Sequence, residues 1–119
     1  MIINFRKLRL AFKVAIRGLG LVIGEEQTFK IQVAAAILVI FLMFYFPLTA
    51  LEKTVLILAI VLVLSLEIIN SQIERILDLL QPNSDPQIRR IKDLSASAVL
   101  VVSIGSFFVG LLIFLPYLL

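Results

Sequence analysis

The sequence contains no cysteine and no histidine among its 119 residues. The absence of cysteine excludes disulfide bonds, thiol nucleophiles and thiolate metal sites. The absence of histidine excludes imidazole ligands and histidine general bases. Any catalysis must therefore depend on carboxylates, amides, hydroxyls, lysine or arginine, and a bound metal is expected to be a hard cation such as Mg²⁺.

Polar residues are also scarce. The chain is 61% apolar and 16% charged, and its mean hydropathy is +1.13. A soluble domain is typically about 45 to 50% apolar, so this chain has too little polar surface to cover a soluble globule. The composition indicates an integral membrane protein with a single domain over residues 1–119. The length allows about three spans, because each spanning helix uses about 20 residues.

The placement of basic residues orients the chain in the membrane. They are Arg6, Lys7, Arg9, Lys13, Arg17 and Lys30 before the first long apolar run, Lys53 between the first and second runs, and Arg75, Arg89, Arg90 and Lys92 between the second and third. The positive-inside rule predicts a cytoplasmic (inner) membrane protein whose amino terminus is cytoplasmic and whose carboxyl terminus is outside. The net charge of +3 then reflects topology and contact with anionic lipid, not nucleic-acid binding.

The first elements are predicted from helical periodicity. Residues 1–24 carry basic and apolar residues on opposite sides of a helix, which is typical of an amphipathic helix on the cytoplasmic leaflet. Gly24 is predicted to end this helix, since glycine is common just past a helix carboxyl end. The first span is expected over 26–47, where Pro47 interrupts the apolar run.

The other two spans have recognisable starts. Thr49 and Glu52 form the pattern of a capping box, which predicts that a second helix covers residues 50–80 after a tight hairpin. Asp85 is a plausible N-cap for a third spanning helix over 86–115. The predicted fold is an all-α membrane protein with one surface helix and three transmembrane helices.

The second predicted span ends in an unusual polar face. Glu67, Asn70, Ser71, Glu74 and Asp78 lie at i, i+3, i+4, i+7 and i+11, which places them on one side of a helix. No charged residue occurs over 55–66, so this face follows directly from a membrane-like segment. A carboxylate in hydrocarbon costs at least about 2.5 to 3.5 kcal/mol, and such a residue is therefore a functional-site hypothesis.

These residue types fit phosphoryl transfer at the inner membrane surface. Two carboxylates from different helices, Glu26 and Glu74, are able to hold a divalent cation that also takes phosphate oxygens. Glu67 is deeper, and a partly desolvated carboxylate suits a general base acting on a hydroxyl. Asn70 is placed to orient that base or bind the nucleotide, and Lys92 to neutralise phosphate charge. No P-loop pattern is present.

This combination resembles the signature of a family of small prokaryotic membrane kinases, the diacylglycerol kinase and undecaprenol kinase family. The residues that carry the resemblance are Glu67-Ile-Ile-Asn70-Ser71-Gln-Ile-Glu74, Asp78 and Lys92-Asp93. It extends over nearly the whole chain, and the ending from Gly110 to Pro116 is similar to the undecaprenol kinase branch. The departures are Thr28, Gln32 and Ser95-Ala96-Ser97, which affect the expected lipid selectivity.

The resemblance implies a homotrimer that uses Mg-ATP to phosphorylate a membrane lipid alcohol, either undecaprenol or diacylglycerol. The sequence does not decide whether a site forms within one protomer or between neighbours, but a 119-residue chain with three spans can hardly enclose both substrates alone, which favours shared active sites. By that similarity Glu67 is the catalytic base, and Glu26 and Glu74 bind magnesium and with it the nucleotide. The further nucleotide contacts that it implies are Lys7, Arg17, Asn70, Asn83, Ser84, Asp85, Lys92 and Asp93.

Simpler interpretations remain open for the individual residues. In these interpretations Glu74 is only a solvated residue paired with an arginine, Glu25 is a solvated helix start, and Lys92 is a membrane anchor. Asn70 and Ser71 are then only hydrogen-bonding contacts between helices. Two other functions are also consistent with three spans. A proton or ion pathway would need polar residues further along the second span, and a small assembly subunit would not need Glu67.

Overall fold

The computed structural model describes residues 2–80 and 85–119 and contains four helices within them. They are α1 (Phe5–Glu25), α2 (Gln27–Tyr45), α3 (Ala50–Leu80) and α4 (Pro86–Leu118). The all-α fold class is therefore confirmed. Asn83 and Ser84, two of the expected nucleotide contacts, lie outside the described residues.

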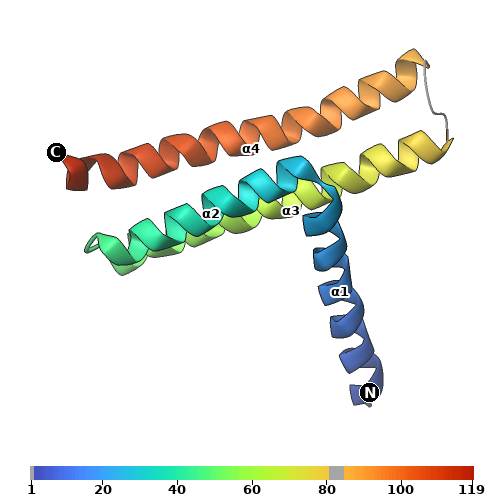
Figure 1. Ribbon diagram of the computed structural model, residues 1–119, viewed down its shortest axis with the longest axis horizontal. Coiled ribbons are helices and arrows are strands. Elements are labelled where there is room, and N and C mark those ends of the chain that lie inside the picture. Colours follow the sequence, from blue (N-terminus) through green and yellow to red (C-terminus); the bar gives the residue numbers. More distant parts are fainter. Residues whose placement is uncertain (1, 81–84) are drawn as a thin grey trace.

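The helices form a slender bundle with one projecting arm. α2 and α3 run side by side, α4 lies along α3, and α1 leaves the bundle at a steep angle from the start of α2 (Figure 1). α2, α3 and α4 are long and apolar enough to cross a membrane. Many of their large apolar side chains face outward, and Phe41, Phe44 and Phe107 are 66%, 76% and 64% exposed. Such a surface is suited to lipid and not to water.

The junction between α1 and α2 differs from the prediction. Gly24 lies inside α1 and the helix continues through Glu25, so the predicted stop at Gly24 is wrong. The turn is made at Glu26, which is extended with φ −105° and ψ 112°, while its N–H still bonds to the Val22 carbonyl. A glycine stop needs a left-handed φ, and no described glycine has a positive φ.

The other helix ends follow their local signals. The Thr49 N–H donates to Glu52 Oε1 at 2.9 Å and the Glu52 N–H donates to Thr49 Oγ1 at 3.1 Å, which confirms the capping box. Asp85 caps α4 by accepting from the Gln87 N–H at 2.8 Å. α4 extends past the predicted end to Leu118, with Pro116 in its last turn. A proline there forfeits only one intrahelical hydrogen bond.

The best-packed part of the bundle lies at the α2–α3 hairpin. Met43, Leu48 and Leu56 are buried there, and Phe46 and Tyr117 pack against them. The Tyr117 hydroxyl donates to Glu52 Oε1 at 2.6 Å, which ties the carboxyl end of α4 to the start of α3. This cluster holds the three long helices together at one end of the bundle, while the contacts between helices toward the other end involve polar residues.

Candidate functional site

Glu67 lies on the interior stripe of α3. Val63, Glu67 and Ser71 follow one another at four-residue spacing and are 8%, 6% and 6% exposed. Residues at this spacing share one helix face. The Glu67 carboxylate therefore faces the interior of the bundle and not bulk lipid, and little of it is accessible to water.

Polar groups of α2 and α4 lie on the same side of the bundle as this carboxylate. The Gln32 side chain of α2 lies close to Glu67, and the charges of Glu74 and Glu26 act on it. Gln32 Nε2 also donates to Ser103 Oγ of α4 at 3.3 Å. Beyond them, toward the α2–α3 hairpin, a hollow of about 260 Å³ extends between α2, α3 and α4. Its lining includes Gln32, Val63 and Ser103, so it lies next to Glu67 in the bundle.

Asn70 connects α3 to α4 one turn further along. The Ser95 hydroxyl donates to Asn70 Oδ1 at 2.7 Å, and Asn70 Nδ2 donates to Glu74 Oε1 at 3.3 Å. This chain of hydrogen bonds sets the position of the Glu74 carboxylate relative to α4. Sequence reasoning identified Asn70 and Glu74 but did not identify Ser95 as the partner of Asn70, because a spacing along one helix does not name the residue opposite.

The remaining predicted contacts are distributed over several surfaces. Lys92 Nζ forms an ion pair with Asp78 Oδ1, so Lys92 faces α3. Asp93 lines a separate shallow hollow beside Arg89 and Arg90, on α4 itself. Lys7 and Arg17 are exposed on α1. A single chain therefore brings Lys92 close to the Glu74 end of α3, while Lys7, Arg17 and Asp93 lie on other faces.

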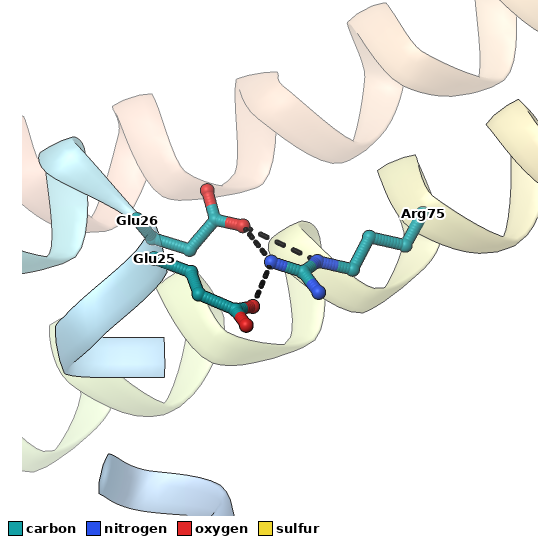
Figure 2. A network of polar contacts seen from close by, with 3 residues as sticks. All are labelled: Glu25, Glu26 and Arg75. Atoms are coloured by element: carbon teal, nitrogen blue, oxygen red, sulfur yellow. Dashed lines mark hydrogen bonds and ion pairs between the residues drawn. The ribbon is translucent and has the colours of Figure 1, made fainter. Parts of the chain in front are cut away.

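Arg75 links the surface helix to the transmembrane bundle (Figure 2). Its Nη2 lies 2.5 Å from Glu25 Oε2 and 2.9 Å from Glu26 Oε1, and its Nε donates to the same Glu26 oxygen at 3.3 Å. Glu25 is thus an ion-pair partner, and the interpretation of it as a merely solvated helix start is wrong. Arg75 pairs with these two acids, whereas the hydrogen bond formed by Glu74 is to Asn70.

The guanidinium changes the chemistry of Glu26. Its hydrogen bonds hold the pKa of the Glu26 carboxyl below the usual range. The nearby Ser71 Oγ is buried and makes no hydrogen bond to a described residue. Arg75 was visible in the sequence as the one charge that ends the apolar side of its helix, but its partners lie 49 and 50 residues away.

The acids suit a divalent cation only as part of a larger coordination shell. Within residues 2–80 and 85–119, no group of three or more acidic side chains is close enough to hold a metal alone. Mg²⁺ usually takes one or two protein carboxylates and completes its shell with water and phosphate oxygens. Glu26 already holds one cationic group, the Arg75 guanidinium. Its oxygen chemistry and that of Glu74 therefore fit Mg²⁺ that arrives with a nucleotide.

Comparisons with known proteins place the chain in a family. A family model described as prokaryotic diacylglycerol kinase matches residues 13–114. The chain is 36% identical over 108 residues to an undecaprenol kinase of Bacillus subtilis, covering 91% of this chain and 88% of that protein. It is 32% identical over 113 residues to a diacylglycerol kinase of Synechocystis sp., covering 94% of this chain and 65% of that protein. Glu67, Asn70, Glu74, Lys92 and Asp93 all lie within the matched range.

Proposed function

Because this chain belongs to the prokaryotic diacylglycerol kinase family, and is therefore a lipid kinase of the membrane, we propose that it transfers the γ-phosphoryl group of ATP to the hydroxyl of undecaprenol. The higher identity to the undecaprenol kinase favours this alcohol over diacylglycerol. Because the chain belongs to a kinase family, we prefer this function to the two others considered, an ion pathway and a non-catalytic assembly subunit.

The observation that carries the proposal is the burial of Glu67 beside a hollow within the spanning bundle. The hydroxyl of a membrane alcohol must lose its proton as it attacks phosphorus. Glu67 accepts that proton, a new bond forms from the alcohol oxygen to the γ-phosphorus, and the bond from phosphorus to the departing ADP oxygen breaks. A carboxylate that water reaches freely would be a weaker choice for this step.

The residues around Glu67 hold the nucleotide in this proposal. Glu26 and Glu74 would hold Mg²⁺, which would neutralise the charge that develops on the phosphate oxygens. Asn70 keeps Glu74 in position through the bond that it already donates. Lys92 leaves Asp78 to pair with phosphate. The other proposed nucleotide contacts are Lys7, Arg17, Asn83, Ser84, Asp85 and Asp93.

We further propose that the active site is shared between protomers of a homotrimer in the inner membrane, with the amino terminus in the cytoplasm. α1 projects from the bundle (Figure 1), so its Lys7 and Arg17 stand apart from Glu67 within one chain. A neighbouring copy is able to bring such residues to the same nucleotide. The basic residues that flank the polar end of the bundle favour a cytoplasmic position for that end.

Phosphate transfer in mixed micelles tests the proposed reaction. We expect the purified protein to transfer ³²P from ATP to undecaprenol faster than to diacylglycerol, and EDTA to abolish transfer until Mg²⁺ is restored. Faster transfer to diacylglycerol would assign the other alcohol to the same site. Transfer that survives complete chelation would contradict the magnesium role of Glu26 and Glu74.

A further inference from the structure

We propose that the Arg75 guanidinium pairs with the Glu26 carboxylate until Mg-ATP binds. The guanidinium then moves from Glu26 to the phosphate oxygens of the nucleotide. This inference rests on the proposed function, because it takes Glu26 as a magnesium ligand. It adds a nucleotide-positioning role to a residue that the sequence pattern of the site does not include.

The contacts of Glu26 place Arg75 in competition with a metal. Two nitrogens of the Arg75 guanidinium, Nε and Nη2, donate hydrogen bonds to the same oxygen, Glu26 Oε1, at 3.3 and 2.9 Å. An oxygen engaged by two donors has few lone-pair directions left for a cation. Mg²⁺ that uses this oxygen must therefore displace the guanidinium, and the positive charge of Arg75 must move to another anion.

The ion pair is suited to reversible displacement. The side chains of Arg75 and Glu26 are 46% and 29% exposed. Ion pairs of this exposure contribute little, less than about a fivefold change in an equilibrium constant. The pairing is thus able to keep Glu26 ionised without closing the site to a divalent cation that carries twice the charge.

Glu25 keeps the guanidinium near the site while it moves. Arg75 Nη2 lies 2.5 Å from Glu25 Oε2, and this contact does not involve Glu26. Loss of the Glu26 bonds therefore leaves the side chain anchored at the α1–α2 junction and not released into solvent (Figure 2). The planar fork of a guanidinium matches two phosphate oxygens, which makes the nucleotide a favourable second partner.

The position of Arg75 in the chain favours the same role. It directly follows Glu74, the second proposed magnesium ligand, on α3. Its side chain reaches from α3 to the junction that carries Glu26, so it lies between the two elements that supply the ligands (Figure 2). A phosphate group bound to the metal at these acids would lie within the range of a long arginine side chain.

Binding of Mn²⁺ to the full-length protein in detergent separates the two halves of this proposal. Without nucleotide, we expect Arg75→Gln to bind Mn²⁺ about two- to fivefold tighter than wild type, because the competing cation is gone. With Mn²⁺ present, we expect the same variant to bind a non-hydrolysable ATP analogue about tenfold more weakly, because a charge-assisted contact is lost. The free-ion EPR signal and the displacement of a fluorescent nucleotide measure the two affinities.

Matched variants make the outcome specific. Arg9→Gln removes the same charge from an exposed position on α1 and should change neither affinity. Arg75→Lys keeps the charge without the fork, so it should bind Mn²⁺ like wild type and the nucleotide more weakly; it also serves if Arg75→Gln does not fold by circular dichroism. Unchanged or weaker Mn²⁺ binding in Arg75→Gln, with binding lost in Glu26→Gln, would overturn the inference about Arg75 alone. Unchanged binding in Glu26→Gln would instead overturn the magnesium role on which it rests.

Discussion

Glu52 in the first turn of α3 and Glu67 just past its middle are the same residue type in opposite situations. At the hairpin end, the Glu52 carboxylate accepts from the Thr49 N–H and from the Tyr117 hydroxyl, beside the packed cluster of Met43, Leu48 and Leu56. Fifteen residues further along α3, Glu67 is buried, and one turn beyond it the Ser71 Oγ is buried without a hydrogen-bond partner among the described residues. Two glutamates on one helix thus differ in burial and in local hydrogen bonding.

This difference distinguishes structure from function in the bundle. The bonds of Glu52 are local and close a helix start, which is a sufficient reason for an acid at that position. Glu67 closes no helix start, and burial of a carboxylate in the bundle costs free energy even with the Gln32 side chain close to it. This cost is consistent with the proposed catalytic role of Glu67, because functional sites commonly hold buried ionisable groups that stability does not require.

Glu67→Gln should have the largest effect on phosphate transfer of the variants that test this difference. The amide is nearly isosteric but is unable to accept a proton, so we expect the rate of phosphate transfer to fall about 10² to 10⁴-fold, the usual contribution of a general base. Affinity for Mg-ATP should change little. The rate at saturating lipid and ATP measures the effect.

Glu52→Gln is the matched control for that variant, since it makes the same chemical change on the same helix close to its start. We expect it to keep a rate close to that of wild type. A similar loss in both variants would mean that glutamine on α3 damages the fold generally, and would remove Glu67 from its proposed catalytic role.

Glu26→Gln and Glu74→Gln should have the next largest effect. They should weaken the binding of Mg-ATP and leave the proposed base, Glu67, in place. Loss of a charged ligand is expected to weaken Mg-ATP about ten- to 150-fold, as for a hydrogen bond to a charged group. Equilibrium binding of a fluorescent ATP analogue measures this change at fixed Mg²⁺. Affinities equal to that of Glu67→Gln in both variants would contradict the division between ligands and base.

Local signals predicted the elements that hold the site. The bounds of α3 follow from the capping box of Thr49 and Glu52 and from the apolar run that precedes Glu67. The Asp85 cap of α4 was likewise readable, because its partner lies two residues away. These features depend on neighbours in the chain, and a single sequence contains that information.

The contacts across helices were not predicted, since periodicity assigns a residue to a face and does not identify its partner. Ser95 with Asn70 and Arg75 with Glu26 join residues 25 and 49 positions apart. The error at Gly24 has the same origin. The chain turns at Glu26, where Arg75 attaches the junction to α3, and a local preference for glycine carries no knowledge of that contact.

Tyr117→Phe should have the smallest effect, which is on stability and not on the rate of phosphate transfer. It removes the hydroxyl that donates to Glu52 Oε1 at 2.6 Å and keeps the ring that packs near Phe46. We expect stability to fall by about 0.5 to 1.5 kcal/mol, the net value of a hydrogen bond, since the capping box still satisfies Glu52. Thermal unfolding in micelles measures the loss, and the rate of phosphate transfer below the transition should equal that of wild type. A large fall in rate would show that the hairpin end controls the geometry of the polar end, and that the two ends do not act independently.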